Sequence, residues 1–192
     1  IWLGTETGIS ILSSKNELLF SYDTQNSINF GLESTYILSL YKDSNNSIWL
    51  GTYSGALYRY NADSSEIKLF NQEPVEPSEL SELPNQSKAS GLSGKIVRGL
   101  SEDSRGKIWV GTQSNGLNQL DTENYVFKHF LSGFKHNIWA LKIDKLDRIW
   151  IASSGGLFIY EQSSDARLTL VKTLYPGKDI INLSYFFGRM WL

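Results

Sequence analysis

The sequence predicts an all-β fold, a β-propeller, from three observations. A short strand motif with Trp as its second residue recurs five times along the 192-residue chain. The closest copies are about as far apart as the 40–45 residues of a four-stranded propeller blade. An acidic turn precedes most copies, and a glycine follows them at a nearly constant distance. Together these features predict about four blades' worth of four-stranded antiparallel sheets.

The motif reads Ile-Trp-Leu-Gly-Thr in its first two copies and ends the chain as Met-Trp-Leu. Successive Trp residues are 47, 60, 41 and 41 positions apart, and an aspartate lies six residues before three of them. Such periodicity indicates structural units that stack on their neighbours. The repeated tryptophans are Trp2, Trp49, Trp109, Trp150 and Trp191. The repeated aspartates are Asp43, Asp103 and Asp144.

Each unit is expected to form four short strands joined by tight turns. In the second unit, alternation and β-branched or aromatic residues predict strands at 36–41, 48–52, 56–60 and 67–70. Asp43 begins a polar turn, because short polar side chains bond their own backbone. The blade parts are predicted at 1–30, 31–70, 96–130, 137–172 and 180–192. A long exposed loop, rich in Pro, Ser and acidic residues, is predicted at 71–95.

The recurring Trp is expected to fill the space between neighbouring blades. A lone four-stranded sheet of this kind exposes two half-apolar faces, and radial stacking of blades buries both. Small residues near the Trp, at Gly51, Gly111 and Ala152, let neighbouring strands approach closely. The tryptophans are therefore assigned to the structural repeat, without a ligand role.

The chain is expected to be a fragment of a larger propeller, because motif copies lie at both ends and four periods carry five copies. The first blade lacks its innermost strand, and the last stops before its third. Unpaired sheet edges promote aggregation, so the isolated segment is expected to behave poorly in solution. By analogy with common propellers, the parent is expected to have seven or eight blades.

The composition excludes several classes of function. Lys and Arg number 18 against 20 Asp and Glu, a formal net charge of −2, so nothing marks the chain as a nucleic-acid binder. The absence of cysteine excludes disulfides and thiolate metal sites. No apolar run approaches the roughly 20 residues that cross a bilayer, and no signal peptide begins the chain.

The sequence predicts no catalytic site, no metal site and no cofactor. His129 and His136 are the only histidines, expected on an outer strand and the loop after it, without the spacing of a helical metal pair. The repeated aspartates resemble a catalytic series, but their place in a hairpin favours turn stabilisation. The Gly-Thr pairs lie within strands, so they do not form a phosphate-binding loop.

Binding is predicted on the face where the second-to-third strand turns and the connections between blades surround the channel. The candidate ligand-binding residues are Tyr53, Gln113 and Trp139, because an aromatic ring among amide groups suits a sugar face. Trp139 stands where other repeats have Leu38 and Arg98, and either lines the channel or packs between blades. Ordinary loop polarity is the alternative interpretation. Other residues on this face are Glu6, Ser154, Phe134 and Lys135.

The most complete repeat spans residues 91–121 and reads Gly-Leu-Ser-Gly-Lys-Ile-Val-Arg-Gly-Leu-Ser-Glu-Asp-Ser-Arg-Gly-Lys-Ile-Trp-Val-Gly-Thr-Gln-Ser-Asn-Gly-Leu-Asn-Gln-Leu-Asp. It resembles the two-component regulator propeller repeat. The resemblance implies a periplasmic sensor propeller of a bacterial receptor. In such receptors an immunoglobulin-like connector, a transmembrane helix and a cytoplasmic histidine kinase or diguanylate cyclase follow, and many are thought to respond to oligosaccharides.

On this resemblance, the expected function is an extracytoplasmic sensor module that binds a small molecule or oligosaccharide without chemistry. The implied partners are that ligand, the rest of the parent receptor and a homodimer formed through the parent. One alternative is a streptogramin lyase-like enzyme, which requires a histidine beside a carboxylate at the channel mouth. A second alternative is a protein-interaction propeller, which would present a flat face without a pocket.

Overall fold

The computed structural model describes residues 1–23, 36–61, 64, 66–70, 91–163, 166–186 and 189–191. Within these residues every regular element is a β-strand, and every strand pair is antiparallel. The all-β prediction is therefore confirmed.

Three sheets have four strands each, in sequence order. The first contains β4 (Ile37–Lys42), β5 (Ser47–Thr52), β6 (Leu57–Asn61) and β7 (Ile67–Phe70). The second contains β8 (Val97–Glu102), β9 (Ile108–Thr112), β10 (Leu117–Asp121) and β11 (Val126–Phe130). The third contains β12 (Ile138–Ile143), β13 (Ile149–Ser153), β14 (Gly156–Gln162) and β15 (Leu168–Leu174).

Two smaller sheets lie at the two ends of the chain. The first consists of β1 (Trp2–Gly4), β2 (Gly8–Leu12) and β3 (Leu18–Asp23). The last consists of β16 (Ser184–Phe186) and β17 (Arg189–Trp191).

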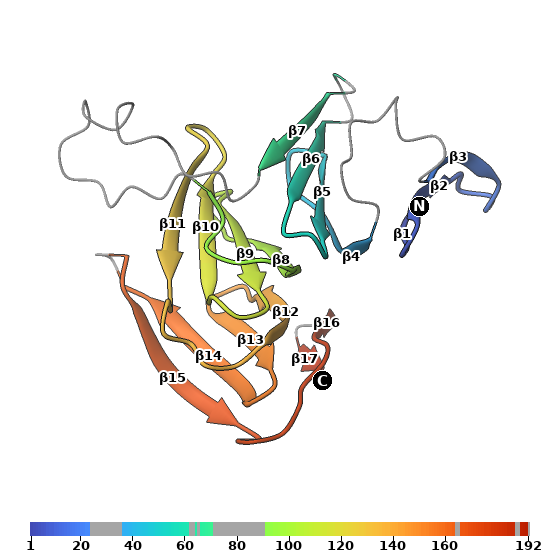
Figure 1. Ribbon diagram of the computed structural model, residues 1–192. Helices are drawn as coiled ribbons and strands as arrows, with labels where there is room; N and C mark the ends of the chain where they lie inside the picture. The colour runs from blue at the N-terminus through green and yellow to red at the C-terminus, as the bar shows by residue number, and fades with distance from the viewer. Residues whose placement is uncertain are drawn as a thin grey trace.

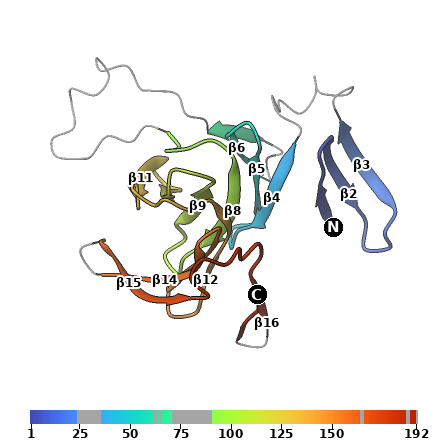
Figure 2. The ribbon, with the colours of Figure 1, turned by 60° about the horizontal axis from the view of Figure 1, so that its bottom comes forward.

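The sheets are arranged as blades around a common centre. In Figure 1 the first strands of successive blades, β4, β8, β12 and β16, gather near the middle of the molecule. The outermost strands β7, β11 and β15 lie at the periphery. The view in Figure 2 likewise shows β8 and β12 inside and β11 and β15 outside. The first strand of each four-stranded blade is thus its innermost strand.

The last residues of the predicted exposed loop at 71–95 are packed in the structure rather than exposed. Residues 71–90 lie outside the described residues, but Gly91, Leu92 and Gly94 are buried rather than exposed. Leu92 is part of an apolar cluster with β8 and β9, and the Ser93 amide donates to Oδ1 of Asn118 at 2.8 Å. This stretch packs on the blade that follows it. The third full blade also runs past the predicted 172, because β15 ends at Leu174.

The small residues of the motif bring neighbouring blades into contact, as predicted. A Cβ on Gly51 would lie 2.5 Å from Cγ1 of Val97, the first residue of the next inner strand. A Cβ on Gly111 would lie 2.8 Å from Cγ2 of Ile138, the first residue of β12. Only a residue without a side chain permits this approach.

All motif tryptophans except Trp191 lie in or against apolar clusters that join neighbouring strands and blades. Trp49 and Trp109 are fully buried, and Trp49 packs with Val97 and Leu100 of the next blade. Trp2 and Trp150 are half-buried, and Trp191, in the last described strand, is 55% exposed.

Each repeated aspartate, here called a hairpin aspartate, stabilises its turn, as predicted. In the second full blade, Oδ1 of Asp103 accepts the backbone amides of Arg105 and Lys107, both at 3.0 Å. Asp43 and Asp144 accept the corresponding amides in their own turns. The hairpin aspartates are therefore structural.

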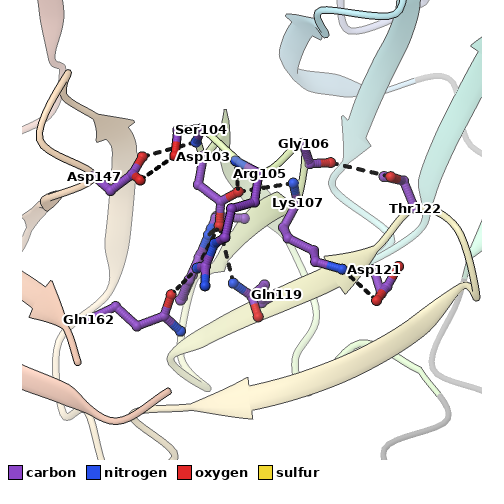
Figure 3. Close-up of polar contacts among 11 residues, drawn as sticks. Asp103, Ser104, Arg105, Gly106, Lys107, Gln119, Asp121, Thr122, Asp147 and Gln162 are labelled. Atoms are coloured by element: carbon purple, nitrogen blue, oxygen red, sulfur yellow. Dashed lines mark hydrogen bonds and ion pairs between the residues drawn. The ribbon is translucent and has the colours of Figure 1, made fainter. Parts of the chain in front are cut away.

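The second carboxylate oxygen of each hairpin aspartate binds the motif tryptophan, a contact that the sequence analysis missed. Oδ2 of Asp103 accepts the Trp109 indole N–H at 2.9 Å and the side-chain amide of Gln119 at 3.3 Å. The same indole bond is 2.8 Å long at Asp43 and 2.9 Å at Asp144. Figure 3 shows Asp103 at the centre of this network of polar contacts. The turn and the tryptophan are thus held together by one carboxylate.

A second polar contact links the same turns of neighbouring blades. The amide and hydroxyl of Ser104 donate to the carboxylate of Asp147 in the next blade, at 2.9 and 2.5 Å (Figure 3). Ser44 makes the equivalent contacts with Glu102, at 2.8 and 2.6 Å. These serine–acid pairs connect blades at the end of the molecule that carries the hairpin turns.

Candidate ligand-binding face

A repeated backbone hydrogen bond forms the opposite end of each blade. The turn after the second strand donates to the residue just before the innermost strand. These bonds join Tyr53 to Tyr36, Gln113 to Ile96 and Ser154 to Asn137, each 3.0 Å from N to O. We call the surface formed by these turns and strand starts the mouth, because it surrounds the inner strands. Tyr53 and Gln113, both predicted site residues, lie at equivalent places on it.

The innermost strands carry a repeated irregularity beside the mouth. The strand register shifts between Ile37 and Ser39, between Val97 and Gly99, and between Ile138 and Ala140. The extra residues at these β-bulges are Leu38, Arg98 and Trp139. A bulge bends its strand and redirects the side chain of the extra residue. The three side chains are accordingly half-buried, and none belongs to an apolar core cluster.

Two predicted residues meet at the mouth through Arg98. The guanidinium carbon of Arg98 lies 4.8 Å from the ring centroid of Trp139, within the range of a cation–π contact. The Arg98 Nε lies 3.5 Å from Oε1 of Gln113. The Trp139 indole N–H donates to Oδ1 of Asp179 at 3.1 Å. Trp139 therefore belongs to the mouth rather than to the packing between blades.

Tyr53 belongs to a separate aromatic pair on the mouth. Its ring centroid lies 5.4 Å from that of Tyr36, whose hydroxyl donates to Oε1 of Glu6 at 3.0 Å. This hydrogen bond and the negative charge of Glu6 raise the pKa of the Tyr36 hydroxyl, while the nearby charge of Arg98 partly opposes the rise. Tyr53 is 54% exposed, so its ring is accessible to a ligand.

Sequence reasoning missed Tyr36, Arg98 and Asp179. Arg98 was considered only as the counterpart of Trp139, and a one-residue register shift leaves no mark in composition or spacing. The backbone just before Arg98 is also strained. Ile96 has a φ of 62°, which a β-branched residue rarely adopts. Its carbonyl is the one that binds Gln113.

The other residues predicted on this face have local roles. The Ser154 hydroxyl accepts the Asn137 amide at 3.0 Å. The Phe134 ring packs edge-on against His136 and Phe158, with centroids 5.6 and 5.2 Å apart. Lys135 is exposed beside this cluster.

A cavity of about 450 Å³ lies between the innermost strands. Its wall is formed by Leu38–Leu40 of β4, Arg98–Leu100 of β8, Ala140–Lys142 of β12 and Asn182–Ser184 near β16. A volume of this size lies in the range of small-ligand pockets. Arg98 belongs both to the cavity wall and to the mouth, so the two are continuous at this residue.

The histidines do not meet the requirement for an enzymatic site. Nε2 of His129, on the outer strand β11, lies 2.8 Å from the carbonyl oxygen of Gly91. His136 stacks on Phe158, with centroids 5.6 Å apart. No hydrogen bond or ion pair joins either histidine to a carboxylate in the described part of the chain. Among the same residues no group of three or more acids and histidines could hold a metal ion, and no helix is long and apolar enough to span a membrane.

Four-stranded antiparallel blades around a central cavity define the chain as part of a β-propeller. The family model of the two-component regulator propeller matches residues 31–54 and 91–114. Two repeats of this chain therefore match the two-component regulator propeller repeat, and the resemblance seen in the sequence is confirmed.

Solved structures share this fold. The extracellular domain of a protein from B. thetaiotaomicron, described as a hybrid two-component system, has a TM-score of 0.71 and 24% sequence identity. The match covers 99% of this chain and 24% of that one. Virginiamycin B lyase from Staphylococcus aureus has a TM-score of 0.64 and 14% identity, covering 97% of this chain and 56% of the lyase. At these identities the likeness shows the fold alone.

One curated relative is a histidine kinase. Histidine kinase P4 of Formosa agariphila is 33% identical over 93 residues, which are 46% of this chain and 6% of the kinase. The chain thus spans a small part of this relative and about a quarter of the extracellular domain from B. thetaiotaomicron.

Proposed function

We propose that this chain is part of the ligand-sensing propeller of a bacterial signal-transduction receptor, and that it binds a small molecule or oligosaccharide without chemistry. The observation that carries the proposal is the mouth, where Arg98 lines the channel cavity and contacts the side chains of Gln113 and Trp139. The two-component regulator propeller repeats and the kinase relative support the receptor context.

The same context supports an extracytoplasmic location, on the periplasmic side of the inner membrane. The matching structure from B. thetaiotaomicron is an extracellular domain. The partner of the propeller is then the rest of its receptor, including the output domain. Sequencing the gene on both sides of this segment tests this part of the proposal. Further blades followed by a transmembrane helix and a kinase or cyclase domain would support it, whereas a cytosolic chain without an output domain would contradict it.

The chemistry of the mouth favours a ligand with both an apolar face and polar groups. The Trp139 ring is fixed by Arg98 on one face and by Asp179 at its indole N–H. Tyr53 and Tyr36 supply a second aromatic surface, with Glu6 as an acceptor beside it. Aromatic rings with polar neighbours suit the mixed surface of a sugar.

A glycan screen with mouth variants tests ligand binding. The longest natural polypeptide that contains this sequence is screened by thermal shift against neutral and acidic oligosaccharides, and hits are measured by calorimetry. Trp139→Ala is expected to weaken binding about thirtyfold, or about 2 kcal/mol, as for a central aromatic contact. Tyr53→Ala and Gln113→Ala are expected to have smaller effects, because each removes one contact at the edge of the mouth.

Leu146→Ala is the matched control for this screen, because Leu146 is 73% exposed and lies in the hairpin turn between β12 and β13, at the opposite end of the blade. It is expected to leave binding unchanged. If Trp139→Ala binds the hits as tightly as the unmodified protein, the mouth is not the ligand site.

The lyase alternative is the less favoured one. It requires a histidine beside a carboxylate at the mouth, and the described contacts of His129 and His136 are with a carbonyl oxygen and with phenylalanine rings. A protein-interaction propeller would present a flat face, whereas this mouth adjoins a cavity.

A further inference from the structure

The channel cavity has an unequal distribution of charge. The residues that line it include two cations, Arg98 and Lys142, and no aspartate or glutamate. The chain as a whole has a formal net charge of −2, so this local excess of positive charge is not a property of the average surface. Clustered charge of one sign in a concave, partly desolvated site raises the local concentration of oppositely charged ligands.

Arg98 has no carboxylate partner in the described residues. Its guanidinium contacts the Trp139 ring and Gln113, both of which are neutral. Asp179, which contacts the same Trp139 ring, accepts its hydrogen bond from the indole N–H of Trp139. Three other cations of the described residues do have such a partner. Arg105, Lys107 and Arg148 each form an ion pair with an aspartate, at 3.2, 2.5 and 2.7 Å.

Lys142 is the second cation of the cavity, and among the described residues it forms no ion pair either. It lies on the innermost strand β12 and is half-buried. The same repeat position holds the uncharged residues Tyr41 and Ser101 in the two preceding blades. Burial lowers the pKa of the Lys142 ammonium, because desolvation disfavours the charged form. An anion bound in the cavity would restore the missing stabilisation.

We propose that the channel cavity takes the acidic group of a sugar ligand, a carboxylate or sulfate, neutralised by Arg98 and Lys142 while a sugar ring contacts Trp139. This inference rests on the proposed ligand-binding function and specifies its ligand class. The planar guanidinium of Arg98 matches the geometry of a carboxylate or sulfate, and the Lys142 ammonium acts as a point charge. Trp139 holds the guanidinium over its ring.

The test compares acidic sugars with neutral counterparts of the same size, on the longest natural polypeptide that contains this sequence. One pair is trigalacturonic acid and its methyl ester, and the other is a sulfated galactose trisaccharide and its unsulfated parent. Calorimetry is expected to show at least about tenfold tighter binding of one acidic member than of its neutral counterpart, since a hydrogen bond to a charged group is worth tenfold to a hundredfold in affinity. This preference should decrease at high salt. The two pairs distinguish a carboxylate from a sulfate as the source of the charge.

Variants locate the effect. Arg98→Gln and Lys142→Gln are each expected to weaken binding of the acidic sugar about tenfold or more, and by a larger factor than binding of its neutral counterpart. Arg98→Lys keeps the charge and should recover part of the loss. Lys128→Gln and Lys145→Gln are the matched controls, because both lysines are exposed and neither lines the cavity.

The possible outcomes separate this inference from the proposed function. Equal binding of acidic and neutral members, unaffected by Arg98→Gln and Lys142→Gln, overturns the acidic-ligand inference and leaves a neutral glycan sensor. Binding of neutral sugars alone gives the same result. If neither these pairs nor the wider glycan panel binds, both the inference and the ligand-sensing function are wrong.

Discussion

The carboxylate of a hairpin aspartate accepts several hydrogen bonds at once. At Asp103 one oxygen holds two backbone amides of the turn, and the other holds Trp109 and Gln119. Asp103 is 7% exposed and Trp109 is 1% exposed, so water cannot readily replace these bonds. Buried donors that lose their acceptor destabilise the folded state.

We therefore expect Asp103→Ala to lower the free energy of unfolding by about 3 kcal/mol, because it leaves the Trp109 indole and two backbone amides without an acceptor. Urea unfolding followed by tryptophan fluorescence measures this change. Glu123→Ala, at an exposed position in the turn after β10, is the control and should change the free energy little. A loss below about 0.5 kcal/mol for Asp103→Ala would show that the carboxylate is dispensable.

Asp144 links residue chemistry to the stability of the protein in acid. Burial alone would raise the pKa of the Asp144 carboxyl, but hydrogen bonds from Trp150, Arg148 and Leu146 outweigh it and lower the pKa below its usual value. A carboxyl with a lowered pKa in the folded state stabilises the protein above its unfolded pKa of about 3.9. This stabilisation is lost as the pH falls through the folded pKa.

Asp144→Asn is accordingly expected to destabilise the protein at pH 7 and to flatten the loss of stability below about pH 4. Chemical unfolding at a series of pH values from 7 to 3 tests this. An unchanged slope in the acid range would mean that Asp144 titrates as it does in the unfolded chain.

At the scale of single residues, the sequence predicted the turn contacts of each hairpin aspartate but not its bond to the motif tryptophan. Asp43, Asp103 and Asp144 were predicted to stabilise turns, because a short acidic side chain in a polar stretch does so through local bonds. The indole bond depends on where the strand after the turn directs its Trp side chain. A spacing of six residues does not determine that direction.

Among the elements, the innermost strands pack tightly against the preceding blade and then bulge at the next residue. Val97 and Ile138 insert beside the glycines of the preceding blade, and the very next residue of each strand is the bulged one. The strands themselves were predicted well, since 36–41 and 67–70 correspond to β4 and β7 within a residue. The bulges were not predicted, because alternation of apolar residues survives a one-residue register shift. For that reason Arg98 was not recognised as part of the site.

Gly51→Ala tests the contact between blades. Its new Cβ would lie 2.5 Å from Cγ1 and 2.8 Å from the carbonyl oxygen of Val97, so a strand must shift. We expect the free energy of unfolding to fall by at least about 2 kcal/mol.

Gly133→Ala is the matched control, since a Cβ there meets nothing within 4 Å. Thermal unfolding of the two variants in parallel gives the comparison. Equal stability of the two would show that the blades do not need glycine at their contact.

In the molecule as a whole, burial decreases from the middle strands of the central blades toward the periphery. Every residue of β5 and β9 is buried, whereas all residues of β15 between its two end residues are exposed. The long outer strand β15 exposes Leu170 and Val171 and has a partner strand on one side only. An edge strand of this kind has few contacts to keep it closed.

Hydrogen exchange measured by mass spectrometry should reflect this gradient. Peptides from β5 and β9 are expected to exchange slowest, and peptides from β15 at least tenfold faster, because opening an edge strand exposes little apolar surface. Protection of β15 equal to that of β9 would indicate that another surface covers its free edge.

The repeated bulge has a consequence for how such a protein changes over generations. Each full blade contributes one bulged residue beside the mouth, Leu38, Arg98 or Trp139. None of the three belongs to an apolar core cluster, so other residues of the strand pack the blade. Under the proposed function, a mutation at the bulged position changes ligand recognition and leaves the shared architecture undisturbed. Duplicating or exchanging a whole blade carries its recognition residue along with it. New ligand preferences can therefore be assembled by recombination, one blade at a time.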